Sequence, residues 1–132
     1  MAKLRHIAVT VPDLEKAAVF YEKTFGMTRA RESDIAIILS DGVVSLALLK
    51  FKTDEQAGDE RGKEFHGLHH MGFVVDDIDE HTKIIEENGG NYHMRLPSAP
   101  DSPSEVKFRD PNGVVFDIVT NKYASGSWGS KA

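Results

Sequence analysis

Three side chains in this sequence are of the types that hold a divalent cation: His6, His70 and Asp117. Neutral imidazoles and carboxylates are ligands for first-row metal ions. Two histidines and one carboxylate also leave coordination positions open for water, substrate or oxygen. A shared site requires the fold to bring the three residues together, so it depends on the strands and helices that carry them.

The two histidines lie at the same point of an internal repeat. The segment LRHIAVTVPDLEK, residues 4–16, returns as LHHMGFVVDDIDE, residues 68–80. A self-match of this kind indicates two copies of one supersecondary unit. The first copy opens with alternating polar and apolar residues, which predicts a strand with His6 opposite its apolar face. The same alternation favours His70, rather than His69, as the residue that faces the site.

Each copy predicts the element order β-α-β-β-β. Asp13 and Asp77 follow the first strands and are good helix N-caps. Three runs of β-forming residues come next, and the Asp41-Gly42 pair between the last two in the first copy is a strong hairpin signal. The sequence therefore predicts one domain, 1–132, made of a first module at about 3–51, a polar linker at 52–67, a second module at about 68–121 and a Gly- and Ser-rich tail at 122–132.

The last strand of each module bears on the third ligand. Aligning the two hairpins on their turn glycines, Gly42 and Gly113, places Leu46 opposite Asp117. Asp117 is then expected on the face of the two histidines, and Leu46 leaves the fourth symmetric position without a ligand. We expect a partly apolar pocket around the site, formed by Ala8, Thr10, Val44, Leu46, Leu48, Val74 and Val115.

Composition narrows the classes of partner. The chain has 16 basic and 21 acidic residues, a net charge of −5, and no basic block, which argues against nucleic acid and anionic membranes. It has no cysteine, which excludes disulfides, thiolate metal sites and thiol nucleophiles. No apolar run reaches the roughly 20 residues of a membrane span, and the first residues lack a signal region. These features predict a soluble, cytoplasmic protein, and the expected partly apolar pocket indicates a small-molecule substrate.

The sequence resembles the vicinal oxygen chelate superfamily, which includes glyoxalase I, extradiol dioxygenases, fosfomycin-resistance enzymes, methylmalonyl-CoA epimerase and bleomycin-binding proteins. The segments LRHIAVTVPDLEKAAVFYEKTFGM, LHHMGFVVDDID and FRDPNGVVFDIV carry the resemblance, which covers residues 3–121. It implies an α+β fold in which two βαβββ modules form an open, barrel-like sheet cup around a metal. His6, His70 and Asp117 stand at the positions of the family's metal ligands.

The resemblance also implies a metal-dependent enzyme, with Fe²⁺ or Mn²⁺ favoured over Zn²⁺ or Ni²⁺. Leu46 stands where glyoxalase I and the epimerase usually have a fourth ligand, so an extradiol-dioxygenase-like reaction is the first hypothesis. The alternatives are a glyoxalase-I-like lyase or isomerase, a fosfomycin-type epoxide-opening enzyme, and a non-catalytic drug-binding protein. The sequence identifies no acid–base residue; His66 and His93 are the candidates for a proton shuttle.

Two expectations concern assembly and the pocket rim. Exposed sheet edges need cover, and most homo-oligomers are two-fold dimers, so we expect a homodimer. The metal site is then completed either within one chain or by exchange between chains, and the long linker favours exchange. The proline-containing loop from Leu96 to Ser104 is the main insertion in the second module, and we expect it to border the pocket.

Overall fold

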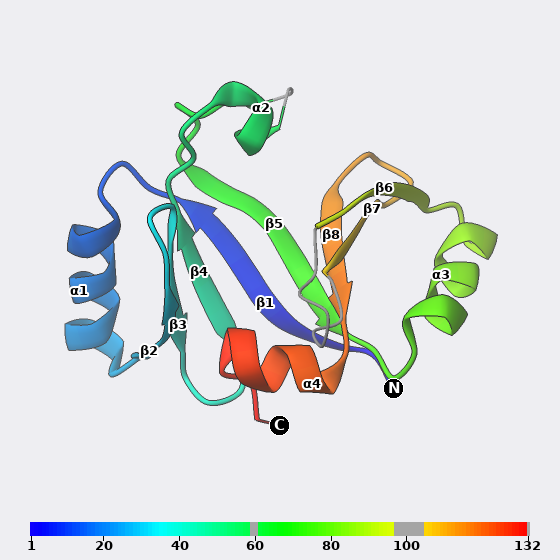
Figure 1. The fold of residues 1–132 in the computed structure, drawn as a ribbon, viewed down its shortest axis with the longest axis horizontal. Helices are drawn as coiled ribbons and strands as arrows, with labels where there is room; N and C mark the ends of the chain where they lie inside the picture. Colours follow the sequence, from blue (N-terminus) through cyan, green and yellow to red (C-terminus); the bar gives the residue numbers. More distant parts are fainter. Residues whose placement is uncertain (59–60, 97–104, 132) are drawn as a thin grey trace.

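The computed structural model consists of one eight-stranded mixed sheet that curls around a concave face (Figure 1). It describes residues 1–58, 61–96 and 105–131. The first module contributes β1 (Lys3–Thr10), α1 (Leu14–Phe25), β2 (Thr28–Glu32), β3 (Ala36–Ser40) and β4 (Ser45–Leu49). After α2 (Asp54–Ala57), the second contributes β5 (Gly67–Val74), α3 (Ile78–Glu87), β6 (Asn91–Arg95), β7 (Val106–Arg109) and β8 (Val115–Val119). The predicted α+β cup of two βαβββ modules is confirmed.

The first strands of the two modules pair with each other at the centre of the sheet. The strand order is β2-β3-β4-β1-β5-β8-β7-β6, with β1 and β5 antiparallel. On either side of this pair, β4 lies parallel to β1 and β8 lies parallel to β5. Each half therefore repeats the other about the β1–β5 pair, which places the repeated histidines on adjacent strands.

The two longer helices lie on the outside of the cup, at its opposite ends (Figure 1). Asp13 and Asp77 cap them: each side chain accepts a hydrogen bond from the backbone N–H three residues later, at 3.0 and 2.8 Å. Under α1, Ala18 packs with Ile37, Leu39 and Leu48. Under α3, a second apolar cluster contains Val75, Val106, Phe108 and Ile118. Each of the two longer helices therefore covers an apolar cluster of its own.

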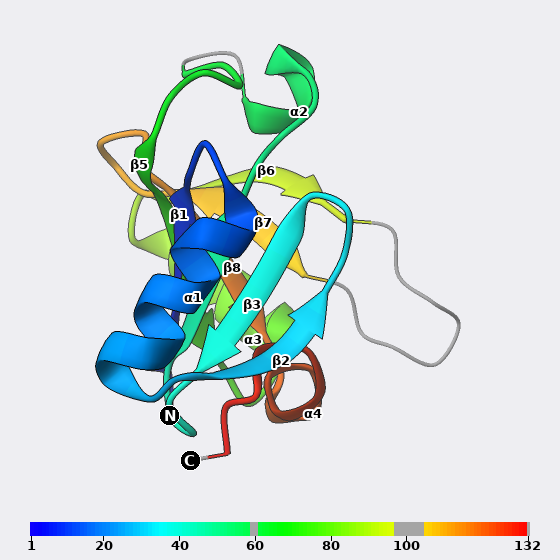
Figure 2. The ribbon, with the colours of Figure 1, turned by 90° about the vertical axis from the view of Figure 1, so that its left-hand side faces the viewer.

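The residues after the second module form helical turns rather than a free tail. They comprise α4 (Asn121–Tyr123) and a π-helical turn, η1 (Ala124–Trp128). The side view shows this segment below the sheet and α2 above it (Figure 2). Trp128 is 1% exposed and packs with Val74, Val119 and Ala124. The C-terminal segment therefore closes one end of the cup.

Among the described residues, every helix is too short or too polar to cross a lipid bilayer.

Candidate metal centre

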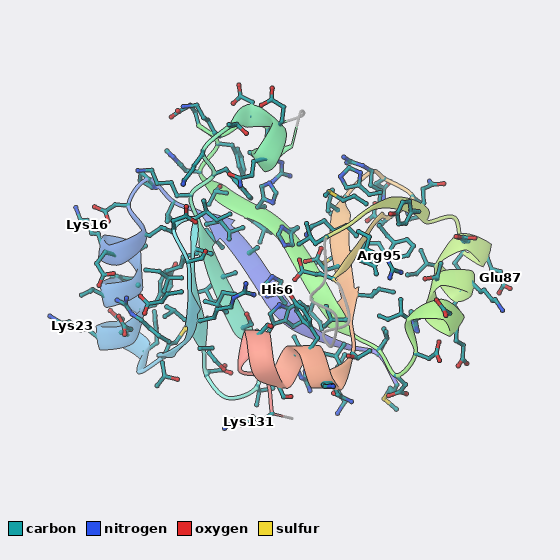
Figure 3. The ribbon with its side chains drawn as sticks, viewed as in Figure 1. His6, Lys16, Lys23, Glu87, Arg95 and Lys131 are labelled. Carbon is teal, nitrogen blue, oxygen red and sulfur yellow. The ribbon has the colours of Figure 1, made fainter. Side chains whose placement is uncertain are left out.

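His6, His70 and Asp117 come together on the concave face. They belong to the three neighbouring strands β1, β5 and β8, all three are buried, and each offers a ligand atom within 4.8 Å of the others. Figure 3 shows His6 near the middle of the molecule, whereas Lys16, Lys23 and Glu87 project outward from the helices. One chain supplies all three residues. Completion of the site by exchange between chains stays a prediction.

A hydrogen-bond relay orients the ring of His70. His69 Nε2 lies 2.6 Å from the carbonyl oxygen of Ala57, which can only accept, so His69 donates there. His69 Nδ1 is then the acceptor in its 2.8 Å contact with His70 Nδ1. The proton of the neutral His70 ring is accordingly on Nδ1. Its Nε2 keeps a free lone pair, directed toward Asp117.

Asp117 carries the oxygen that this lone pair meets. Asp117 Oδ2 lies 3.1 Å from His70 Nε2, yet this fully buried oxygen makes no hydrogen bond within the described part of the chain. A carboxylate oxygen and an imidazole lone pair held side by side repel each other unless a cation lies between them. Buried oxygens are rarely left without a partner. The donor set therefore fits a divalent cation.

His6 is held on two sides. Its Nδ1 lies 2.9 Å from the hydroxyl of the buried Ser45, the residue paired with it on β4. Its ring stacks on the indole of Trp128, with centroids 4.2 Å apart and planes 8° apart. Because Ser45 occupies Nδ1, Nε2 is the nitrogen left for a metal. Contacts of this kind behind a ligand fix its orientation in metal sites.

Burial keeps both imidazoles neutral. Burial, with the neighbouring His70 acting in the same direction, lowers the pKa of His6 to about 4. It also places the pKa of His70 well below its usual value, with Lys107 and His69 acting in the same direction. The His70–Asp117 contact is therefore not an ion pair. Both rings are in the state that coordinates metal near neutral pH.

A chain of charged and polar groups lies behind Asp117. Lys107, its partner on β7, donates to Asp117 Oδ1 at 2.7 Å and to Glu105 at 3.2 Å. Tyr123 donates to the other oxygen of Glu105 at 3.0 Å. Desolvation lowers the pKa of the Lys107 ammonium, but the two carboxylates outweigh it and raise that pKa. Lys107 therefore stays charged. Its charge is matched by the carboxylates, and Asp117 Oδ2 remains available.

Two of the three candidate ligands, His6 and His70, border a cavity of about 880 Å³, within the usual size range of small-molecule sites. His6 and His70 line it, with apolar groups from β3 and β4, among them Ile38 and Leu49. Four basic side chains and two acidic ones also line it among the described residues: Arg31, Arg61, Lys107, Arg109, Glu55 and Glu105. Most of the charge at the cavity wall is therefore positive.

A comparison with protein families identifies the fold. The model described as Glyoxalase/Bleomycin resistance protein/Dioxygenase superfamily matches residues 3–118. The chain belongs to this superfamily. The resemblance carried by the repeated strands and the final hairpin is thus confirmed.

Named relatives within the superfamily differ in reaction. The chain is 33% identical to a probable trivalent organoarsenical cleaving enzyme from Bacillus subtilis, over 91% of this chain and 81% of that protein. It is 25% identical to a probable lactoylglutathione lyase from Vibrio parahaemolyticus, over 93% and 94% of the two chains. Methylmalonyl-CoA epimerase from Streptomyces coelicolor has the same fold, with a TM-score of 0.72 and 22% identity over 89% and 96%.

Seven residues are expected from the sequence to surround the pocket. Among them, Val115 lines the cavity. Ala8, Thr10 and Val74 are buried and covered: Ala8 packs on Ile38 and Ala47, Thr10 donates to backbone oxygens of the linker, and Val74 lies under Trp128. The expectation that these residues are exposed to a ligand was wrong. Thr10 and Val74 are covered because the linker and the C-terminal segment pack over the ends of their strands, whereas Ala8 is covered by side chains of β3 and β4.

An error in the predicted register of β4 explains the other three expected pocket residues. The described wall of the cavity does not include Val44, Leu46 or Leu48. Leu46 and Leu48 pack against α1, and Ala47 faces the cup with Leu49. Aligning the turn glycines shifted the register by one residue, because the second turn is one residue longer: Asp41 bonds to Val44, but Asp110 bonds to Val114. Val44 itself lies in the first turn.

The same shift changes the fourth symmetric position. Ala8 pairs with Ala47 on β4, as the repeat-equivalent Gly72 pairs with Asp117 on β8. Ala47, and not Leu46, is therefore the counterpart of Asp117. An alanine offers no ligand atom, so the candidate ligands in this chain are still His6, His70 and Asp117.

The two candidate proton shuttles differ in position. His93 lines the cavity, whereas His66 is exposed and lies outside the described wall. Leu96 also lines the cavity, but residues 97–104 of the expected rim loop fall outside the described residues.

Sequence reasoning missed Ser45, Glu105, Lys107 and Trp128. Lys107 alternates with Val106 and Phe108 on a strand paired with that of Asp117, which is a signal that places it on the inner face.

Proposed function

We propose that this chain is a divalent-metal-dependent enzyme that binds a small, anionic, partly apolar substrate through two adjacent oxygen atoms. The observation that carries the proposal is the buried, unbonded Asp117 Oδ2 beside the free lone pair of His70, with His6 completing the donor set. When bound there, Fe²⁺ or Mn²⁺ would supply Lewis acidity and one-electron redox chemistry. Zn²⁺ and Ni²⁺ have the same ligand preferences and are the alternative ions.

The cavity supports an anionic substrate. Among the described residues, basic side chains outnumber acidic ones on its wall, although the whole chain carries a net charge of −5. Arg31 lines the cavity from β2, where its backbone pairs with Ile38, and its guanidinium makes no hydrogen bond or ion pair with the described part of the chain. A guanidinium in this position is suited to binding a carboxylate in two-point contact. The apolar part of the wall, which includes Ile38 and Leu49, would contact a ring or an alkyl group of the substrate.

An extradiol-type cleavage of a catechol is the first candidate reaction. Two histidines and one carboxylate with open positions are the donor set typical of non-haem Fe²⁺ oxygenases, and Ala47 adds no fourth ligand. Within this chain, His6, His70 and Asp117 would orient the substrate oxygens. His93 or the Glu105–Lys107–Tyr123 network would hold or move the proton of a substrate hydroxyl.

A glyoxalase-like isomerase or lyase is the second candidate, and it is supported by the names of the lactoylglutathione lyase relatives. It needs a base near the substrate carbon, and Glu105 on the cavity wall supplies a carboxylate. The organoarsenical reaction named for the Bacillus relative is not extended to this chain, because trivalent arsenic prefers thiolates and the sequence has no cysteine. Fosfomycin-type epoxide opening and drug binding without chemistry remain alternatives for the assay.

The test begins with metal content after expression in medium supplemented with Fe²⁺ and Mn²⁺. The loaded protein is then assayed for oxygen uptake with catechol and with a catechol carrying a carboxylate side chain. Parallel assays use methylglyoxal with glutathione, and fosfomycin with a thiol. We expect one metal ion per chain, oxygen uptake that prefers the carboxylated catechol, and loss of both in Asp117→Asn.

The matched controls separate the parts of the proposal. His81→Ala changes a histidine on α3, away from the cavity wall, and should leave metal content unchanged. Arg31→Gln should raise KM for the carboxylated catechol about ten-fold while metal content stays the same. A wild-type protein that binds none of the four ions would contradict the metal-dependent function. Turnover of methylglyoxal alone would replace the first candidate with the second.

A further inference from the structure

The C-terminal segment is clamped onto the first module next to the metal centre. Three hydrogen bonds attach it to the β3–β4 hairpin, at 2.6 to 2.9 Å: Ser40 Oγ to the Gly129 oxygen, Ser130 Oγ to the Val43 oxygen, and Lys131 N to the Gly42 oxygen. Gly129 adopts a left-handed conformation, with φ of 64°. A Cβ there would lie 2.9 Å from the Ser40 side chain and 3.0 Å from that of Ala30. These three hydrogen bonds, called the clamp below, therefore hold the turn at Gly129 tightly against β2 and β3.

The clamp holds Trp128 against His6 and Gly72. The indole is 1% exposed and stacks on the His6 ring at 4.2 Å. A Cβ added to Gly72 would lie 2.7 Å from Trp128 Cη2 and 3.0 Å from His6 Cβ. The absence of a side chain on β5 at this position thus lets the indole reach the histidine.

We propose that Trp128 is a positioning residue for the metal centre: it holds the plane of the His6 ring so that Nε2 points at the ion. The inference rests on the proposed function, because it requires that His6 bind a metal. An imidazole on a β-strand has two side-chain torsions to fix. The hydroxyl of Ser45 restrains it through Nδ1, and the indole restrains the ring plane. The buried indole also keeps water from that face of the ligand.

Metal affinity measured by chelator competition tests this role in wild type and two variants. Trp128→Phe keeps an aromatic face, whereas Trp128→Leu keeps an apolar side chain without one. We expect Trp128→Leu to weaken Co²⁺ affinity about ten-fold, the size of effect usual for groups that orient a ligand, and Trp128→Phe to stay within about three-fold of wild type. Phe20→Leu is the matched control. It removes an exposed aromatic ring from α1, outside the described cavity wall, and should bind Co²⁺ as the wild type does.

Fluorescence gives a second readout, independent of activity and of the stability of the variants. Trp128 is the one tryptophan of the sequence, so all indole emission reports on this contact. Co²⁺ bound by His6 should quench that emission at one equivalent per chain. In Asp117→Asn the quenching should require a higher Co²⁺ concentration.

Each outcome has a defined meaning. Wild-type affinity in a folded Trp128→Leu variant would overturn the positioning role and leave the proposed function intact. Co²⁺ binding without quenching in the wild type would also overturn it, and this result needs no variant that folds. No Co²⁺ binding by the wild type would overturn both. In that case, the ring-current shift of the His6 protons by NMR would still show whether the stacking exists.

Discussion

At the scale of single residues, the hydrogen bond made by Nδ1 of each histidine determines whether Nε2 is available to bind a metal ion. His70 Nδ1 is tied to His69, and His6 Nδ1 is tied to Ser45, so both Nε2 atoms are left for the site. Alternation along the strand assigns His69 to the face opposite His70, but its ring lines the cavity and contacts that of His70. The relay through its ring gives it a different role, that of fixing the tautomer of His70.

We predict that His70→Ala abolishes binding of one metal ion, whereas His69→Ala weakens it about ten- to one hundred-fold. The first change removes a donor. The second removes the acceptor that keeps the His70 proton on Nδ1, so the protonated nitrogen can turn toward Asp117. Isothermal titration with Mn²⁺ or Ni²⁺ measures both affinities. Equal loss in the two variants would mean that His69 itself is a ligand.

Acid stability follows from the buried imidazoles. The pKa of His6 is near 6.5 in an unfolded chain and about 4 in the fold, so the unfolded state takes up the proton first as pH falls. Stability is full above about pH 6.5 and declines between pH 6.5 and 4, with about 3 kcal/mol from His6 in the metal-free protein. Urea unfolding at pH 7 and pH 4.5, with a chelator present, measures this loss.

The comparison for that measurement is His6→Asn, which cannot titrate in this range. Its stability should change with pH less steeply than that of the wild type. The same slope in both proteins would show that His6 is not the group whose protonation destabilises the fold. His81→Asn provides a control on the surface of α3.

At the scale of elements, β5 and η1 fit together only because residue 72 is a glycine. We predict that Gly72→Ala destabilises the protein by about 1–3 kcal/mol, the usual cost of overpacking, because the added methyl meets Trp128. In the double variant with Trp128→Leu, the cost of the methyl should shrink, since contacting residues are not additive. Chemical denaturation measures all four proteins of the cycle.

Gly126→Ala is the control for this cycle, since a Cβ at that glycine has no heavy atom within 4 Å. It lies in the same C-terminal segment as Trp128 and should cost little. If Gly72→Ala is as mild as Gly126→Ala, the indole does not occupy the space beside β5.

The sequence predicted the elements better than their register. Alternation and capping residues located β1, α1, β5 and α3, because these signals are local. The register of β4 depends on the length of the turn before it. The two hairpin turns differ in length by one residue, so aligning Gly42 with Gly113 shifted the predicted register of β4 by one residue. A slip of one residue exchanges the two faces of a strand, which is why Leu46 was assigned to the pocket and packs under α1.

At the scale of the whole molecule, the three candidate ligands already lie together within one chain. The antiparallel β1–β5 pair joins the two modules directly, so an exchanged dimer would have to replace this central pairing with one between chains. The homodimer itself remains a prediction. We expect that mixing His6→Ala with Asp117→Ala protein restores no metal binding, because neither chain can lend its intact residue to the other.

Metal content after co-refolding of the two variants checks this expectation, with each variant refolded alone as the reference. Recovery of about a quarter of the wild-type content is the result of complete exchange, since half of the dimers are mixed and each mixed dimer has one intact site of two. Such recovery would show that the modules pair between chains.

The internal repeat allowed the three donors to be predicted, since equivalent residues of equivalent strands must lie near the same axis. The surroundings of the donors could not be predicted in this way. Trp128 and Glu105 lie outside the repeated segments, and Ser45 depended on the register of β4. Long-range packing placed these residues, and no local pattern encodes it.

The pairing of β1 with β5 has a consequence for ancestry. A shorter forebear with a single βαβββ unit could have built the same cup by pairing its first strand with that of an identical copy. Duplication and fusion would then have turned a contact between two chains into one within a chain, and freed each half to diverge. In such a forebear the two halves were equal, so Ala47 and Asp117 descend from one codon, and one of them has since kept or gained its carboxylate. The difference between Ala47 and Asp117 would then result from this divergence: the second module contributes a carboxylate to the candidate metal site, and the first module contributes an apolar side chain at the equivalent position.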